Sequence, residues 1–185
     1  MIDRNWFLII SVLLFASCTS SSPLFLNSGN WQLNGAAGWQ FDQDMIIGES
    51  EGEAGYLVSN QSFTDFVLEL EFNPSSELNS GIFIRCEGTE MTPNACYEFN
   101  IWDENPNQEY RTGAIVMKSN PIAKVNTIGK WNTYKIKAKG NSLQAWVNGQ
   151  KVSDIKDSDL ASGFIGLQAA KGGKVMFRNI TIKEI

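Results

Sequence analysis

The stretch WNTYKIKAKGNSLQAWVNGQKVSDI, residues 131–155, alternates apolar and polar side chains and is interrupted by two turn signals. The signals are Gly140-Asn141 and Asn148-Gly149, and Asn-Gly in particular favours the type I′ turn that matches the twist of paired strands. Because successive side chains on a strand point to opposite faces, each apolar row predicts a buried face and each lysine row a solvated one. The stretch therefore predicts three antiparallel strands joined by tight turns.

The rest of the chain has the same character. DFVLELEF at 65–72 alternates strictly, and GIFIR at 81–85 follows a turn cluster of Pro, Ser, Asn and Gly. In the closing stretch, residues 173–185, the apolar parity changes, which predicts a bulge near Arg178-Asn179. No segment after residue 18 has a sustained helical period of apolar residues. These patterns predict an all-β fold, a two-sheet antiparallel β-sandwich or jelly roll, with a barrel as the alternative.

Composition excludes several classes of function. The 185 residues include no histidine, so Ser-His-Asp and Cys-His catalysis and histidine-ligated zinc are excluded. Proton transfer in an enzyme of this sequence must come from carboxylates, Tyr, Lys or Cys. With 15 basic and 20 acidic residues and no basic patch, nucleic acid is not an expected partner. No metal or cofactor is predicted.

The first residues have the pattern of a lipoprotein signal peptide. WFLIISVLLFA, residues 6–16, is an apolar run with the length of a signal-peptide core, and small residues lead from it to Cys18. The pattern resembles the lipobox of bacterial lipoproteins, in which that cysteine is lipidated; an uncleaved anchor helix is the alternative. We predict a signal peptide at 1–17, the lipidated cysteine and a flexible tether at 18–29, and a single β-sandwich domain at 30–185. The expected location is the bacterial cell envelope, with a lipid anchor at the outer membrane or the periplasmic face.

Cys86 and Cys96 are the remaining cysteines. In an oxidising compartment they are candidates for a disulfide, and two free thiols are the alternative. Cys86 shares its parity with Ile84, whereas Cys96 shares its parity with Glu98, so a bridge requires a bulge or a strand end where alternation lapses. A catalytic cysteine is disfavoured, because no histidine is present to activate it.

Residues 97–103, YEFNIWD, carry polar groups on one face of a predicted strand. Glu98, Asn100 and Trp102 share that face, while the alternate positions are apolar. If the neighbouring strands lie in the same sheet, further outward residues join the patch, namely Glu69, Glu71, Phe83 and Arg85. Such a mixture suits a saccharide, whose hydroxyls donate and accept hydrogen bonds and whose C–H face packs on an aromatic ring. The alternative is a surface ion pair between Glu69 and Arg85, with Trp102 capping the sheet edge.

Five motifs in order resemble the family of 3-keto-disaccharide hydrolase domains. They are NSGIFIR at 79–85, YEFNIWD at 97–103, RTGAI at 111–115, GKWNTYKIKAKGNSLQAWVNGQKV at 129–152, and GFIGLQ with VMFRNITIKEI within 163–185. The resemblance covers residues 30–185 and implies a concanavalin A-like β-sandwich with a saccharide site on a concave sheet face. It also implies cleavage of glycosides oxidised at the third carbon of the sugar, at a site lined by Arg85, Glu98, Asn100 and Gln168. Where family members often carry histidines, this chain has Ala145 and Ala170.

The combined interpretation is a lipid-anchored envelope protein that binds an oligosaccharide or glycoside and cleaves a glycosidic bond. Glu98 is the expected acid/base, and Glu69 is the expected second carboxylate. The expected substrate-binding residues are Arg85, Asn100, Trp102, Arg111 and Gln168. The cleavage is either hydrolysis by paired carboxyl groups or elimination followed by hydration with one base. Two other functions stay open: a non-catalytic carbohydrate-binding module and a structural protein of an envelope complex.

Overall fold

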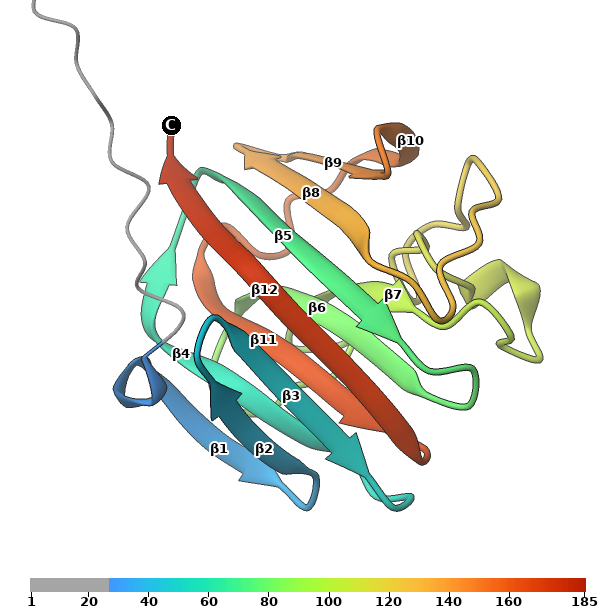
Figure 1. Ribbon diagram of the computed structural model, residues 1–185. Coiled ribbons are helices and arrows are strands. Elements are labelled where there is room, and N and C mark those ends of the chain that lie inside the picture. The colour runs from blue at the N-terminus through green and yellow to red at the C-terminus, as the bar shows by residue number, and fades with distance from the viewer. Residues whose placement is uncertain (1–26) are drawn as a thin grey trace, which may run out of the picture.

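Antiparallel strands in two sheets make up most of the protein. The computed structural model describes residues 27–185, and the predicted signal peptide, Cys18 and most of the predicted tether lie outside the described residues. The sheets pack face to face, with the seven-stranded sheet in front of the five-stranded sheet in Figure 1. Neither sheet closes on itself, so the predicted β-sandwich is confirmed and the barrel alternative is wrong.

The five-stranded sheet has the order β1-β4-β11-β6-β7. Its strands are β1 (Trp31–Gly35), β4 (Gly55–Phe63), β11 (Gly163–Ala170), β6 (Asn79–Cys86) and β7 (Tyr97–Ile101). The loop after β7 covers the edge of this strand. The backbone N–H of Asn100 donates to the Ala114 carbonyl, and the backbone N–H of Val116 donates to the Glu98 carbonyl, both at 3.0 Å. An edge covered in this way presents fewer unpaired backbone groups to other chains.

The seven-stranded sheet has the order β10-β9-β8-β5-β12-β3-β2. Its strands are β10 (Gln150–Lys156), β9 (Ser142–Val147), β8 (Asn132–Lys139), β5 (Phe66–Pro74), β12 (Gly173–Glu184), β3 (Met45–Ser50) and β2 (Gly38–Asp42). The described residues also include two short 3-10 helices, η2 (Ser28–Asn30) and η3 (Gln108–Tyr110). No helix within 27–185 has the length and apolar character needed to cross a bilayer.

The inner faces of the two sheets form the core. The strict alternation of β5 is confirmed, because Phe66, Leu68, Leu70 and Phe72 are all buried. They belong to one cluster with the inward residues of the five-stranded sheet. Full burial of each such side chain contributes roughly 1.5–3 kcal/mol relative to exposure, so the sandwich depends on this alternation.

Both predicted hairpins and the predicted bulge are confirmed. Two-residue turns join β8 to β9 and β9 to β10. Gly140, Asn148 and Gly149 have φ values of 52°, 51° and 77°, the left-handed conformation that such turns need. In β12 the register with β5 shifts between Arg178 and Thr181. This bulge lets apolar residues of both parities face the core.

One topological expectation is wrong. β5 does not lie beside β6 and β7, because it pairs with β8 and β12 in the seven-stranded sheet. The chain crosses from one sheet to the other in the turn cluster at residues 75–78. Glu69 and Glu71 on the outer face of β5 are therefore on the opposite side of the molecule from Glu98 on the outer face of β7.

Candidate functional site

Glu98 lies on the outer face of the five-stranded sheet. The alternate residues of β7 belong to the core cluster, so Glu98 and Asn100 have the opposite orientation, as alternation predicts. In the neighbouring strand β6, Phe83 pairs with Glu98 and Gly81 pairs with Asn100. Phe83 is outward as predicted, but it is covered by other side chains and only 1% exposed.

Gly81 forms the floor beside Glu98. A β-carbon at Gly81 would lie 3.2 Å from Glu98 Oε1 and 3.3 Å from Glu98 Cγ. On its other side, Gly81 pairs with Gln168 of β11, which pairs with Tyr56 of β4. Because Gly81 has no side chain, the Glu98 side chain can occupy the space above it. Gln168 lies on the opposite side of Gly81 in the sheet.

Glu98 is a buried carboxylic acid without a partner. The residue is 7% exposed, and within the described part of the chain its carboxyl group makes no hydrogen bond or ion pair. Removal from water disfavours the charged form, and this desolvation raises the pKa of Glu98 to about 7. A carboxyl group that titrates near neutral pH can both accept and donate a proton, which general acid–base catalysis requires.

Two amide oxygens on the same face are also without partners. Gln168 Nε2 donates to the Tyr56 hydroxyl at 3.3 Å, but Gln168 Oε1 is buried and unbonded among the described residues. Asn79 Oδ1 is buried and unbonded as well, and Asn79 shares the outward parity of Gly81. A buried acceptor left without a donor costs about 1–3 kcal/mol, so a ligand hydroxyl that bonds to it is favoured.

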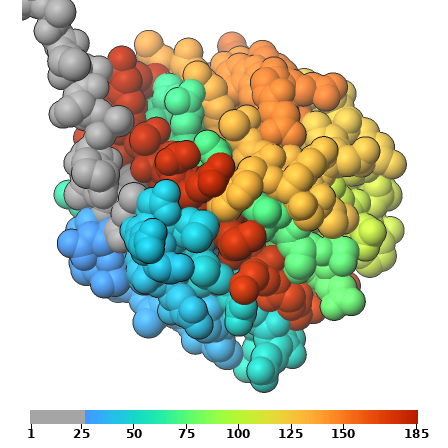
Figure 2. Space-filling model, in the orientation of Figure 1, coloured from blue at the N-terminus to red at the C-terminus, as the bar shows by residue number. Residues whose placement is uncertain are grey.

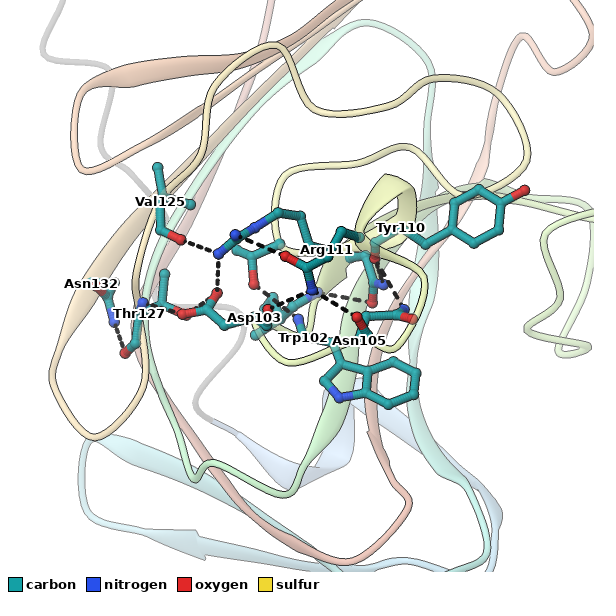
Figure 3. Close-up of polar contacts among 12 residues, drawn as sticks. Trp102, Asp103, Asn105, Tyr110, Arg111, Val125, Thr127 and Asn132 are labelled. Atoms are coloured by element: carbon teal, nitrogen blue, oxygen red, sulfur yellow. Dashed lines mark hydrogen bonds and ion pairs between the residues drawn. The ribbon is translucent and has the colours of Figure 1, made fainter.

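Trp102 and Lys171 border this face. Trp102 directly follows β7 and Lys171 directly follows β11, and Lys171 Nζ lies 4.1 Å from the centre of the Trp102 ring. Because β6 lies between these strands, the contact crosses over the start of β6, at Asn79. Figure 3 shows the Trp102 indole turned away from the Arg111 guanidinium. Trp102 is partly exposed, and a cation near such a ring contributes about 0.5–1 kcal/mol, a contact weak enough to be exchanged for a ligand.

The loop between Cys86 and Cys96, which a disulfide closes, borders the same outer face of the five-stranded sheet. Cys86 and Cys96 are bonded to each other, and Met91 between them packs with the outward apolar residues. Gly166 makes room for this loop, since a β-carbon there would lie 2.5 Å from Met91 Sδ. The lapse in alternation that the bridge requires occurs at Arg85, whose φ is 53°.

We call the whole surface the Glu98 face; it consists of Tyr56, Asn79, Gly81, Glu98, Trp102, Gln168 and Lys171.

Arg85 does not line the Glu98 face, contrary to the prediction. The left-handed backbone at Arg85 reverses its parity, and the side chain is fully buried. Its guanidinium donates to the carbonyls of Thr64, Gly140 and Leu160 at 2.7, 2.8 and 3.1 Å and lies 3.1 Å from Asp65 Oδ1. Arg85 therefore joins loops at one end of the sandwich and has no group free for substrate.

Asn100 and Arg111 stabilise the loop after β7, and Figure 3 shows the contacts that Arg111 makes there. Asn100 Nδ2 donates to the Tyr110 carbonyl. Arg111 is 4% exposed; its guanidinium donates to the Val125 carbonyl at 2.5 Å and lies 3.8 Å from Asp103 Oδ1. The predictions that Asn100 orients the sugar and that Arg111 closes over the sheet face are wrong, because both side chains are directed into the loop.

Glu69, the predicted second carboxylate, is separated from Glu98 by both sheets. Its exposed carboxylate lies 2.7 Å from Lys135 Nζ on the outer face of the seven-stranded sheet. The predicted catalytic pair is therefore wrong, and so is the alternative ion pair with Arg85. The structure adds Tyr56, Asn79 and Lys171 to the site. The outward parity within NSGIFIR is a signal for Asn79, whereas no local pattern indicates Tyr56 or Lys171.

Comparisons with known proteins agree with this architecture. The model of the 3-keto-alpha-glucoside-1,2-lyase-like domain matches residues 23–183. Among curated proteins, none matches the chain. Two similar crystal structures, each described as a "putative glycosyl hydrolase" from Parabacteroides distasonis ATCC 8503, have TM-scores of 0.73 and 0.70 at 18% and 24% identity. These alignments cover 85% and 82% of this chain and 89% and 94% of those chains.

A third similar structure is the carbohydrate-binding module CBM66 from Bacillus subtilis. Its TM-score is 0.66 at 19% identity, and the alignment covers 84% of this chain and 96% of that chain. At these identities the structural likeness shows a shared sandwich fold.

Proposed function

This chain belongs to the 3-keto-alpha-glucoside-1,2-lyase-like domain family, and on this premise we propose that it binds a saccharide on the Glu98 face and cleaves the glycosidic bond of a 3-keto-glycoside there. The observation that carries the proposal is the buried, unpaired carboxyl of Glu98, whose pKa is about 7. The unbonded oxygens of Gln168 and Asn79 supply acceptors for sugar hydroxyls. Trp102 supplies an aromatic ring at the margin of the site.

The proposed reaction is an elimination with Glu98 as the base. The ketone at the third carbon acidifies the C–H bond at the second carbon, and the Glu98 carboxylate takes this proton to leave an enolate. The electron pair then forms a double bond between the first and second carbons, and the bond from the first carbon to the glycosidic oxygen breaks. Protonated Glu98 returns the proton to the departing oxygen, and addition of water to the double bond gives net hydrolysis.

The position of Glu69 favours elimination over a mechanism that pairs Glu69 with Glu98. Paired carboxyls in ordinary glycosidases lie about 5–5.5 Å or 6.5–9.5 Å apart across the scissile bond. Glu69, the best candidate that the sequence offers for a second carboxylate, is on the other side of the sandwich. An elimination needs one base and a donor to the enolate oxygen, and the Tyr56 hydroxyl and the Lys171 ammonium border the same face as Glu98.

A non-catalytic carbohydrate-binding module is the second candidate, and the observation that favours it is Ala170. This residue occupies the outward position paired with Asn79, where a histidine would reach the Glu98 face. The other position that lacks an expected histidine, Ala145, is fully buried in the core and does not bear on the site. The Glu98 face therefore lacks at most one expected proton-transferring group, the histidine at position 170. Catalysis on this face then depends on Glu98.

The test is Glu98→Gln, assayed for binding and for turnover on a panel of glucosides and their 3-keto derivatives. Binding is measured by calorimetry and turnover by release of the leaving group. We expect binding to be retained and turnover of 3-keto substrates to fall about a hundredfold or more, because a positioned acid/base contributes at least that much. Glu69→Gln, on the opposite face, is the matched control for turnover and should turn over 3-keto substrates as wild type does.

The other outcomes decide between the candidates. Wild-type binding without any turnover supports the carbohydrate-binding module. Wild-type protein that neither binds nor turns over any member of the panel contradicts both and supports a structural role in a protein complex. Equal turnover by wild type and Glu98→Gln contradicts the assignment of Glu98 as the acid/base.

We further propose that the chain is a lipoprotein of the bacterial cell envelope, anchored through Cys18. The support is the apolar run at 6–16 followed by small residues and this cysteine. Cys18→Ser should move the protein from the membrane fraction to the soluble fraction of the cell envelope and prevent incorporation of labelled fatty acid. A Cys18→Ser variant that remains membrane-bound and labelled would contradict the anchor.

A further inference from the structure

The outer face of the seven-stranded sheet carries a groove of about 550 Å³. It lies on the side of the sandwich opposite to the Glu98 face, and Figure 2 looks onto this side. Volumes of this size are typical of sites for small organic ligands. We call it the Trp146 groove; its lining includes Glu69, Thr133, Lys135, Trp146, Asn179 and Thr181.

One row of paired residues crosses the Trp146 groove. Trp146 of β9 pairs with Lys135 of β8, Lys135 pairs with Glu69 of β5, and Glu69 pairs with Thr181 of β12. Strands lie about 4.8 Å apart, so the row spans roughly 14 Å across the sheet. An indole, an ammonium group, a carboxylate and a hydroxyl thus face one elongated depression.

Trp146 lines the groove and also has an ammonium group against its ring. Lys151 of β10 pairs with Trp146, and Lys151 Nζ lies 5.3 Å from the ring centre. This ammonium is held by Asp154 at 2.7 Å. Lys151 is not part of the groove lining, whereas Lys135 on the other side of Trp146 is. The partly exposed ring therefore offers an apolar surface to whatever occupies the groove.

The charges around the groove are already paired. Glu69 lies 2.7 Å from Lys135, and Glu71 lies 2.7 Å from Arg178. Asn179 Nδ2 donates to Glu71 Oε1 at 2.8 Å. A charged occupant would have to compete with these pairs, whereas a neutral polyhydroxyl ligand can bond to their remaining lone pairs and protons and to the threonine hydroxyls.

We infer that the Trp146 groove is a second saccharide site that binds a neutral oligosaccharide. A sugar ring packs on Trp146, and its hydroxyls bond to the Glu69–Lys135 pair and to Thr133 and Thr181. The groove shares no residue with the Glu98 face and lies on the other side of the sandwich, so the two sites bind separate chains or distant parts of one glycan. The inference does not depend on the proposed cleavage at Glu98.

The experiment follows the indole N–H signals of ¹⁵N-labelled protein during titration with neutral gluco-oligosaccharides of the maltose, cellobiose and laminaribiose series. Single Trp→Phe variants assign the signals. We expect the Trp146 signal to shift with one or more series, and to shift in the same way in Trp102→Ala and in Glu98→Gln, which change the opposite face. A response at Trp146 in Glu98→Gln is thus readable whether or not the cleavage proposal holds.

Variants at the groove test the role of the ring. Trp146→Ala should weaken this binding roughly tenfold or more, while Trp146→Phe, which keeps an aromatic face, should weaken it less. Lys137→Ala, on the neighbouring strand β8 and the same face but outside the groove lining, is the control and should bind as wild type. Thermal unfolding confirms that each variant is folded.

Three outcomes would overturn the inference. The Trp146 signal stays in place with every series, or folded Trp146→Ala binds as tightly as wild type. In the third, the Trp146 signal shifts with protein concentration alone, which would make this face a contact between two copies of the chain.

Discussion

At the residue scale, Glu98 is placed where it costs stability. Its carboxyl group is withdrawn from water without a hydrogen bond or ion pair among the described residues. Groups that perturb the fold in this way are concentrated at functional sites, because catalysis needs a pKa near the working pH. Gln168 Oε1 and Asn79 Oδ1 add two more unsatisfied groups to the same face. The coincidence of three such groups on one surface is what separates this face from an ordinary solvated sheet.

The first prediction concerns pH. Because the folded-state pKa of Glu98 is about 7, above the ordinary glutamate value of 4.5, the folded protein holds this proton more tightly than the unfolded chain. This tighter proton binding by Glu98 stabilises the folded protein fully below about pH 4.5, and the stabilisation is lost as the pH rises through about 7. Its total is on the order of 3 kcal/mol.

Glu98→Gln removes this dependence. The variant should unfold at a higher temperature than wild type at pH 8, and the difference should become small at pH 4.5. Thermal unfolding at both pH values measures it, with Glu69→Gln as the control for an exposed carboxylate. The difference in unfolding temperature between wild type and Glu98→Gln should therefore change between the two pH values. An equal difference at pH 8 and pH 4.5 would contradict the burial of the Glu98 carboxyl group.

The second prediction concerns Gly81. In Gly81→Ala the new methyl group lies 3.2 Å from Glu98 Oε1 and 3.4 Å from Phe83 Cε2, so the Glu98 side chain has to move. We expect weaker glycoside binding or turnover, with a loss of unfolding free energy of only about 1 kcal/mol. Gly88→Ala is the matched control, because nothing lies within 4 Å of a β-carbon there. Unchanged ligand affinity and turnover in folded Gly81→Ala would show that this glycine is not the floor of a site.

The third prediction separates Arg85 from the site. Arg85→Met leaves the carbonyls of Thr64, Gly140 and Leu160 without this donor and Asp65 without its ion-pair partner. Loss of one partner from a buried network costs about 3–5 kcal/mol, which lowers the unfolding temperature by roughly 10 °C or more. Saccharide affinity of the folded variant, measured well below that temperature, should equal that of wild type.

Arg178→Met is the matched control for Arg85→Met, because the Arg178–Glu71 pair is partly exposed and contributes about 0–1 kcal/mol. An Arg85→Met variant that keeps its unfolding temperature but loses saccharide binding would contradict this prediction. It would support the role in the saccharide site that the family motif implies for Arg85.

At the scale of single elements, alternation predicts a strand well wherever the backbone stays extended. It placed the inward and outward residues of β5 and β7 correctly, and the Asn-Gly signals placed the turns around β9. It failed at Arg85, because a left-handed residue inside a strand reverses the parity of the residues after it and leaves no mark in the apolar pattern. The same residue turns Cys86 outward toward Cys96, so the failed site prediction and the disulfide have one cause.

The fourth prediction concerns the loop between Cys86 and Cys96. The bridge joins residues 10 positions apart, and closing a loop of this length is expected to contribute about 2–3 kcal/mol. Urea unfolding with and without a reductant should show a loss of that size. Because the loop carries Met91 against Gly166 beside the Glu98 face, the reduced protein should also bind its glycoside more weakly.

Cys96→Ser gives an independent check on that loop. It should match the reduced wild type in both stability and affinity and should not respond to reductant. Identical urea midpoints for oxidised and reduced wild type would contradict a closed loop.

At the scale of the whole molecule, the order of strands in the sheets decides which residues meet. The sequence indicates strands and their faces through local patterns, but pairing between distant strands depends on the packing of two complete sheets. β5 and β6 are consecutive in the chain yet belong to different sheets, so Glu69 and Glu98 share an outward parity but lie on opposite sides of the molecule. Tyr56 reaches the site only because β4 pairs with β11, more than 100 residues away in sequence.

The most direct test of Glu98 as a functional acid is a ¹³C NMR titration of its side-chain carboxyl, without and with a saturating 3-keto-glycoside. We predict a midpoint near pH 7 in the free protein, and a change of that midpoint when the sugar covers the group. A midpoint near the ordinary value for glutamate, indifferent to the glycoside, would contradict a functional acid on this face.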